Sequence, residues 1–296
     1  RPGVYDLPAG SYHADPVPSG SLSSSGARRL LPPSCPALFH QWLTTGQEHK
    51  SEFDFGHAAH ALVLGIGAPT VVIDAKDWKT KAAQAERDAA YAVGATPLLR
   101  ADYEQVQAMA AALAEHPIAS ALFQPGRGKP EQTLVWMDQE SGVWRRAMLD
   151  WLPDSNDTGR LIIPDYKTTK SAQPGSLSKA LYDYGYIQQA PWYLDGIEAL
   201  DLSPGGEPAF VFVFQEKTPP YLVTVVQPSP ETVQWGRVLN RKALDLYRRC
   251  STAGHWPGYT DEVISLSIPG WAEYQLQAAW ERGDLDPVTP LTEVRS

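Results

Sequence analysis

Two apolar segments, each of strand length, lie on either side of a polar stretch near the middle of the chain. Residues 145–152 and 161–163 are rich in Leu, Ile and Trp, and the residues between them have the Pro, Asp, Asn and Gly composition of a turn. We predict two antiparallel strands joined as a hairpin. Asp150 and Asp165 stand at mirrored positions about this turn, so strand pairing would set them opposite each other. Lys167 follows two residues later and should point to the same face as Asp165.

The preceding segment adds a third carboxylate to this row. Glu131 opens an apolar run that ends in a second turn at residues 138–142, and reflection about that turn sets Glu131 opposite Asp150. A three-stranded meander over residues 131–168 would align the three acids, although a register shift of one residue would turn a side chain away. Because neighbouring carboxylates repel unless a cation lies between them, the row predicts a metal site with Lys167 at its edge. The alternative for any single acid is an ordinary polar residue on a solvated sheet face.

The rest of the chain alternates between helical and strand periodicity. We predict helices at Ala27–Leu31, Pro36–Thr44, Phe53–Leu64, Asp77–Val93, Asp102–Leu113, Ser178–Leu200 and Pro230–Thr252, and further strands at Val71–Ile73, Ala209–Gln215 and Tyr221–Val226. The predicted fold class is α/β, with a mixed sheet of about five strands flanked by helices. We expect a single domain overall, in which residues 1–50 form an N-terminal arm and helices packed on a core of residues 51–296.

Length and composition limit the class of protein. The chain has 296 residues, enough for a large core, and no apolar run approaches the length of a membrane span. Its two cysteines, Cys35 and Cys250, cannot form an iron–sulphur or Cys-rich zinc site and indicate a reducing cytosol. The net charge of −9 argues against a protein that coats nucleic acid through bulk charge. It leaves room for an enzyme with a local basic channel.

Taken together, these residues resemble the PD-(D/E)xK nuclease superfamily. Within it they are similar to the RecE (exonuclease VIII) type of phage recombination exonuclease. In that superfamily the aspartate of the first half-motif corresponds to Asp150, and the acid-x-Lys half-motif corresponds to Asp165-Tyr166-Lys167. The resemblance implies a restriction-endonuclease-like core within the predicted α/β fold.

Further motifs in the family's order extend the resemblance over nearly the whole chain. A Gly-x-x-x-His pattern selects His60 and not His57, and Gln189 with Tyr193 matches the Gln-x-x-x-Tyr motif of a later helix. Pro191 departs from the family pattern and predicts a kink or a new helix start, because it lacks a backbone donor and crowds the preceding turn. The opening and closing segments are also similar, namely Tyr12-His13, residues 21–26, residues 35–39 and Pro269-Gly-Trp271.

The resemblance implies phosphodiester hydrolysis that depends on Mg²⁺, with Mn²⁺ as a substitute. Mg²⁺ takes carboxylate and carbonyl oxygens, so we expect Asp150, Asp165 and the backbone carbonyl of Tyr166 as its main ligands. His60 would be an additional ligand or an orienting group, and Glu131 an outer or second-metal ligand. The alternative for His60 is a hydrogen-bonded core histidine.

Three further residues have expected catalytic roles. Lys167 would orient or deprotonate the attacking water and offset phosphate charge. Gln189 and Tyr193 lie four residues apart on one helical face, where they would meet the phosphate backbone or the region of Lys167. Plain helix packing is the alternative for both.

The resulting functional hypothesis is a metal-dependent exodeoxyribonuclease that digests linear double-stranded DNA from its ends in phage-type homologous recombination. The resemblance further implies a ring-shaped homo-oligomer, a possible single-strand annealing protein as partner, and a place in the bacterial host cytosol with no membrane association. Two rival hypotheses remain at this point. One is a structure-specific or restriction-type endonuclease, and the other is a non-catalytic DNA-binding relative.

Overall fold

Strands β5 (Gly128–Met137) and β6 (Trp144–Pro153) form a long antiparallel hairpin. Strand β1 (Gly3–Asp6) pairs antiparallel with the other edge of β5, and the short β2 (Leu22–Ser23) pairs parallel with β6. Pro130 pairs with Trp151 and Gln132 with Leu149. Glu131 therefore lies across from Asp150, in the register predicted from the turn between the strands.

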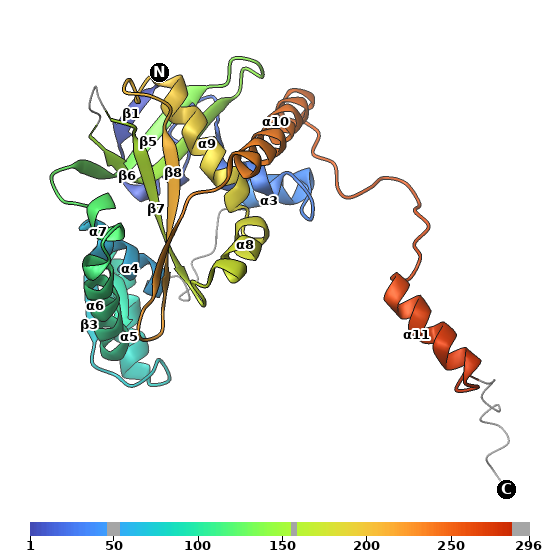
Figure 1. Ribbon diagram of the computed structural model, residues 1–296, viewed down its shortest axis with the longest axis horizontal. Helices are drawn as coiled ribbons and strands as arrows, with labels where there is room; N and C mark the ends of the chain where they lie inside the picture. The colour runs from blue at the N-terminus through green and yellow to red at the C-terminus, as the bar shows by residue number, and fades with distance from the viewer. Residues whose placement is uncertain (46–53, 155–158, 286–296) are drawn as a thin grey trace, which may run out of the picture. The chain divides into compact units, whose positions relative to one another are not determined.

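A second ladder contains the acid-x-Lys strand. Strand β7 (Ile162–Thr169) pairs parallel with β8 (Ala209–Glu216), and β8 pairs antiparallel with β9 (Val223–Val226). The predicted β6–β7 hairpin is wrong in its pairing: among the described residues the ladder partner of β7 is β8. Parallel strands need a crossover connection, and two helices supply it here. Strands β6 and β7 nevertheless lie side by side (Figure 1).

The structure, a computed structural model, describes residues 1–45, 54–154 and 159–285. It divides into two units, Arg1–Gly258 and Tyr259–Ser296. The predicted domain boundary at residue 50 lies outside the described residues. The second unit contains one described helix, α11 (Gly270–Glu281), which was not predicted from the sequence.

Residues 54–122, which precede β5, carry several of the remaining elements. They contain, in chain order, α4 (Asp54–Leu64), β3 (Thr70–Ile73), α5 (Lys81–Ala92), β4 (Thr96–Leu99), α6 (Arg100–Glu115) and α7 (Ala119–Leu122). Strands β3 and β4 pair in parallel as a separate two-stranded ladder. The predicted helices of this region are confirmed with shifted ends, and β4 was not predicted. Helix α4 is the element that brings His60 to β6.

The remaining helices belong to the first unit, Arg1–Gly258. They are α1 (Ala9–His13), α2 (Ser24–Arg29), α3 (Pro36–Thr45), α8 (Pro174–Asp183), α9 (Tyr186–Ala199) and α10 (Pro230–Ala253). Among them, α9 contacts β5, β6 and β8 directly. The single helix predicted for residues 178–200 is in fact two, α8 and α9. Gly185, with a φ of 72°, breaks the helix between them, because a left-handed residue cannot continue a right-handed helix.

Two hydrophobic cores lie on opposite faces of β7 and β8. Phe212 of β8 packs into the first core with Trp192 of α9, whereas Val213 packs into the second with Met109 of α6. This alternation follows from the two-residue period of a strand. Tyr166 of β7 belongs to the second core, so the acid-x-Lys strand is anchored from both sides.

Pro191 lies inside α9 without ending it. It leaves the Ile187 carbonyl without the usual helical donor, and α10 covers this carbonyl at Gly236. A Cβ at Gly236 would lie 1.9 Å from the Ile187 oxygen and 2.7 Å from Pro191 Cγ. Pro191 and Gly236 thus form a close helix–helix contact where a kink or a new helix start was predicted.

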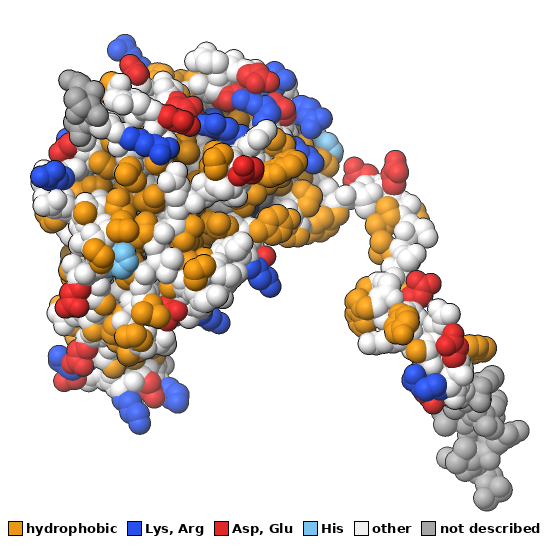
Figure 2. Space-filling view, viewed as in Figure 1, with side chains coloured by type: hydrophobic (Ala, Val, Ile, Leu, Met, Phe, Trp, Pro, Cys, Tyr) orange, Lys and Arg blue, Asp and Glu red, His pale blue; other side chains and the backbone are white. Residues whose placement is uncertain are grey.

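Charged side chains of both signs lie on the surface of the first unit, Arg1–Gly258 (Figure 2), whereas its two thiols are buried. On the face shown in Figure 2, Lys and Arg side chains are interspersed with Asp and Glu side chains, and no continuous basic patch is visible on that face. Cys35 and Cys250 are both buried and unpaired. In the part of the chain that the structure describes, no helix has the length and apolar character needed to cross a membrane.

Candidate active site

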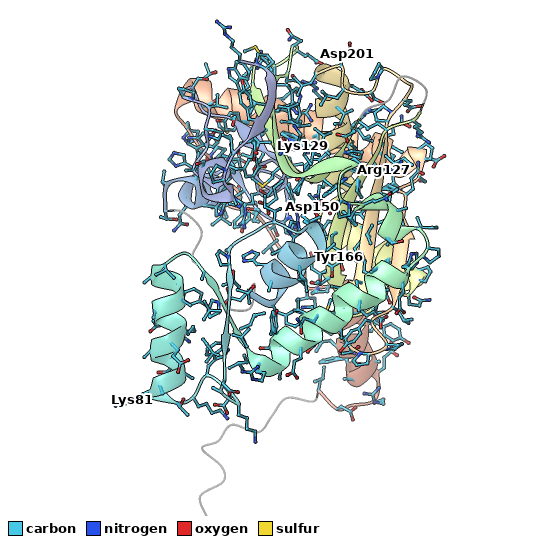
Figure 3. All side chains as sticks on the ribbon, turned by 90° about the vertical axis from the view of Figure 1, so that its left-hand side faces the viewer. Lys81, Arg127, Lys129, Asp150, Tyr166 and Asp201 are labelled. Carbon is cyan, nitrogen blue, oxygen red and sulfur yellow. The ribbon has the colours of Figure 1, made fainter. Side chains whose placement is uncertain are left out.

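Asp150 links three elements at the junction of β6 and β7. Its Oδ2 accepts a hydrogen bond from the backbone N–H of Tyr166 at 2.7 Å, and its Oδ1 lies 3.0 Å from Nε2 of His60 on α4. Only 13% of its side chain is exposed. In Figure 3, Asp150 and Tyr166 lie close together near the middle of the view. The first half-motif thus holds the backbone of the second.

Asp165 and Lys167 form the second half of the site. The carboxylate of Asp165 is almost fully buried and ion-pairs through Oδ2 with the Lys167 ammonium. Its Oδ1 accepts a hydrogen bond from Nε2 of Gln189 on α9 at 2.6 Å. Residues two apart on a strand share a face, which explains why Asp165 and Lys167 meet as predicted. The structure therefore brings Gln189 to the carboxylates.

The two aspartates differ in their electrostatic environment. Burial raises the pKa of Asp165 to about 7, and the nearby Asp150 charge adds to this effect against the opposing Lys167. Burial also opposes ionisation of Asp150, but His60, Lys167 and the Tyr166 N–H together lower its pKa. Lys167 is partly buried, and burial opposes its charge, yet the two carboxylates raise its pKa above the ordinary value. The Asp150 charge thus disfavours ionisation of Asp165, and a cation between the two carboxylates would offset this repulsion.

His60 lies between two carboxylates. Its Nδ1 is 3.8 Å from Oε1 of Glu131, on the side opposite to Asp150. Burial lowers the pKa of His60, but the Asp150 charge and hydrogen bond outweigh it and the net shift is upward. Burial raises the pKa of Glu131. His57, by contrast, is exposed on α4, so the structure places His60 and not His57 with the acids.

Tyr193 lies in the first core, behind the carboxylates. Its ring packs edge-to-face on Phe210 with 5.6 Å between centroids, and only 8% of the residue is exposed. Burial raises its pKa well above the ordinary value, and the charges of Tyr12, Asp165 and Asp150 add to this. This arrangement supports the packing role that the sequence left open for Tyr193.

Two residues near the site, Gln215 and Tyr186, were not predicted. The Tyr166 hydroxyl donates to Oε1 of Gln215 at 2.7 Å, and Nε2 of Gln215 donates to the Met109 carbonyl of α6 at 2.7 Å. Tyr186, the first residue of α9, lies with its ring 5.6 Å from the Lys167 ammonium. Two signals in the sequence could have indicated these residues. Gln215 is a lone glutamine at the end of an apolar strand, and Tyr186 lies three residues before Gln189 on the same helix.

A separate surface cavity of about 780 Å³ lies away from these acids. Its lining includes Arg145, Asp195, Asp138 and Arg241, whose charges are already paired. Arg145 lies 3.0 Å from Asp195, and the Arg241 guanidinium donates to both oxygens of Asp138 at 2.8 and 2.9 Å. Because these charges neutralise one another, we assign them to stability and not to ligand binding.

Sequence comparison places most of the chain in one family. Residues 23–266 match the family described as "PDDEXK-like domain of unknown function (DUF3799)". The chain belongs to this family. It is therefore a member of the PD-(D/E)xK superfamily, and this membership supports a nuclease. No curated protein matches the chain.

A solved structure has the same fold. The crystal structure of a candidate exonuclease from Eubacterium rectale matches with a TM-score of 0.59 and 11% sequence identity, over 91% of this chain and 98% of that one. At this identity the likeness shows the fold alone. It confirms the predicted α/β class, a mixed set of strands flanked by helices in a PD-(D/E)xK arrangement.

The donor atoms at the site suit the Mg²⁺ that the superfamily implies. Asp150, Asp165 and the Tyr166 carbonyl offer hard oxygen ligands, and Asp165 Oδ2 has no hydrogen bond besides its ion pair with Lys167. Within residues 1–45, 54–154 and 159–285 no cluster of three His, Cys, Asp or Glu side chains is preformed for a metal ion. The carboxylate oxygens are engaged with protein donors instead, so binding would require them to exchange those partners for the ion.

Proposed function

We propose that the protein is a Mg²⁺-dependent exodeoxyribonuclease that digests linear double-stranded DNA from its ends. The observation that carries this proposal is the meeting of Asp150, Asp165 and Lys167 at the β6–β7 junction. Two carboxylates and an ammonium are the groups that phosphodiester hydrolysis needs for charge compensation and for activation of water. A protein that only bound DNA would gain nothing from buried acids facing phosphate, because they repel it.

Each residue has a role that its contacts support. Asp150, Asp165 and the Tyr166 carbonyl would hold the ion, with His60 and Glu131 beside Asp150 as further candidates. When bound, Mg²⁺ would supply Lewis-acid stabilisation of phosphate charge and a lowered pKa for water. Lys167 is held beside Asp165, where its ammonium can orient the attacking water. Gln189 fixes the Asp165 carboxylate through the 2.6 Å hydrogen bond.

Exposed cations next to the site support DNA as the substrate. Lys129 precedes Glu131 by two residues on β5, and Arg127 lies two residues further out. Both are exposed, and neither forms an ion pair among the described residues. In Figure 3 they lie close to Asp150, whereas Lys81 lies at the far end of α5. Phosphate contacts from such residues would position a DNA strand at the acids.

A single gel distinguishes exonuclease from endonuclease. The purified protein is incubated in Mg²⁺ with linear duplex DNA and with the same DNA as a covalently closed circle, and Asp165→Ala serves as the control. The proposal predicts loss of the linear DNA alone. Cleavage of the closed circle would assign an endonuclease, and loss of neither DNA would assign a non-catalytic relative.

The proposed biological setting is RecE-type recombination of phage or prophage DNA in the bacterial cytosol, with a single-strand annealing protein as a possible partner. An exonuclease that digests one strand from a duplex end benefits from enclosing its substrate, so we also propose a ring-shaped homo-oligomer. Light scattering at micromolar concentration tests the ring. A monomer mass that is unchanged by DNA and Mg²⁺ would contradict it.

A further inference from the structure

Tyr186 has a tightly fixed position at the start of α9. Gly185, in the left-handed conformation, separates α9 from α8. Arg28 of α2 donates from Nη1 to the Tyr184 carbonyl at 2.6 Å and from Nη2 to the Asp183 carbonyl at 2.7 Å. A Cβ at Gly185 would lie 2.3 Å from Arg28 Cδ. The turn is therefore held by Arg28, and only glycine satisfies both its conformation and its packing.

The ring of Tyr186 covers the strand that neighbours the acid-x-Lys segment. Its centroid is 5.2 Å from that of Phe212 and 5.8 Å from that of Phe214. In the β7–β8 ladder, Phe212 is the partner of Asp165 and Phe214 is the partner of Lys167. The tyrosine thus packs directly beside the two residues of the second half-motif.

The Lys167 ammonium lies between this ring and the Asp165 carboxylate. Its Nζ is 5.6 Å from the Tyr186 centroid and ion-pairs with Asp165. The negative face of an aromatic ring attracts an ammonium at this distance. A lysine side chain has four flexible carbons and loses much rotamer freedom when fixed. Because 22% of its side chain is exposed, the ammonium of Lys167 keeps a single position only where neighbouring side chains restrict its rotamers.

We propose that Tyr186 is a positioning residue whose ring face holds the Lys167 ammonium beside Asp165, leaving the remaining N–H groups of the ammonium open to substrate. This role rests on the proposed function only in so far as Lys167 acts in cleavage. The ring and not the hydroxyl performs it, so phenylalanine can replace Tyr186 and an aliphatic residue cannot.

Nuclear magnetic resonance tests the placement without any activity. In protein labelled with ¹³C-lysine, the signal lost in Lys167→Met identifies the Lys167 Cε methylene, whose protons the ring current of Tyr186 shifts upfield. Tyr186→Phe should keep this shift, and Tyr186→Leu should move the signal to the range of exposed lysines. Tyr186→Met also removes the ring, and its flexible unbranched chain adapts to the remaining space, so it replaces Tyr186→Leu if that variant fails to fold. An unshifted wild-type signal, or no movement in the aliphatic variants, would overturn the proposal.

Cleavage kinetics test the consequence of this placement. Tyr186→Leu should lower kcat about tenfold with little change in KM, because one moderate cation–π contact to a catalytic group is lost. Tyr186→Phe should retain wild-type kcat, as should the control Tyr182→Leu, whose side chain on α8 is exposed. In a Lys167→Met background, Tyr186→Leu should have no further effect. A further tenfold loss of kcat in the Lys167→Met background would refute the positioning role of Tyr186. Absence of cleavage by the wild type would instead refute the proposed function, and the resonance experiment would still test the placement of Lys167.

Discussion

The carboxylate of Asp150 accepts a hydrogen bond from the backbone N–H of Tyr166 at 2.7 Å. Tyr166 stands between Asp165 and Lys167 in the sequence, so this one bond sets the position of the second half-motif relative to the first. Strand β7 gains its ladder hydrogen bonds from β8. The two halves of the site are therefore aligned by a side chain and not by strand pairing.

Replacement of Lys167 separates binding from cleavage. Lys167→Met should lower the single-turnover rate of DNA cleavage roughly 10²- to 10⁴-fold, the usual contribution of a proton-transferring or water-orienting group. DNA affinity should change little, because the residue supplies one of several phosphate contacts. The matched control is Lys179→Met on α8, where the lysine is 80% exposed. Equal rates for the two variants would remove Lys167 from the mechanism.

The two histidines of α4 form a natural pair for comparison. His60→Ala should reduce cleavage roughly 10- to 100-fold, the typical effect of losing a group that orients a metal ligand, because His60 bridges Asp150 and Glu131. His57→Ala should have little effect, since His57 is exposed. Rates for both variants are measured across a range of Mg²⁺ concentrations. Similar small losses in both would make His60 a structural residue.

The bond between Tyr166 and Gln215 should contribute to stability. Tyr166→Phe leaves the buried Oε1 of Gln215 without its donor, which should lower the free energy of unfolding by about 1–3 kcal/mol. The control Tyr182→Phe removes an exposed hydroxyl and should stay within about 0.5 kcal/mol of the wild type. Urea denaturation measures both. An unchanged midpoint for Tyr166→Phe would show that the hydrogen bond adds no net stability.

Asp138 should make stability depend on acid pH. Its pKa is lowered to about 2: burial opposes this, but the bonds from Arg241 and Ser141 outweigh it. A carboxyl group with a lowered folded-state pKa stabilises the fold above its unfolded pKa of about 4, and that stability is lost as the pH falls from about 4 to about 2. Asp138→Asn should lower the free energy of unfolding by about 1–2 kcal/mol at pH 7, a value discounted for the partial exposure of Arg241. The loss should be smaller at pH 3.

Thermal or urea unfolding of the wild type and Asp138→Asn at pH 7, 5 and 3 measures this dependence. The difference between the two proteins should be equal at pH 7 and 5 and smaller at pH 3. A difference that grew on acidification would have the wrong sign and would refute the assignment.

The sequence predicted the parts of the fold that depend on local pairing. The position of Glu131 across from Asp150 followed from a short turn, because a tight hairpin fixes register. The meeting of Asp165 and Lys167 followed from strand alternation alone. His60 was selected by resemblance, and the structure places it 3.0 Å from Asp150.

The errors arose where distant segments determine the structure. Strand β7 was assigned to a hairpin because its parallel partner β8 is separated from it by two helices, a pairing that no local pattern reveals. One helix was predicted across Gly185, since a glycine inside a helical pattern does not by itself signal a left-handed residue. The contact of Tyr186 with Lys167 depends on that break, so it could not be predicted either.

Cleavage of linear duplex DNA in Mg²⁺ by the wild type and by Asp165→Ala tests the central claim most directly. Asp165 is one of the two carboxylates of the site, accepts a hydrogen bond from Gln189 and forms an ion pair with Lys167. Its replacement should preserve the fold, because the repulsion between the two carboxylates is relieved. The wild type should degrade the DNA, and the folded variant, confirmed by circular dichroism, should leave it intact. Equal degradation by both proteins, with contaminating nuclease excluded, would contradict the assignment of the active site.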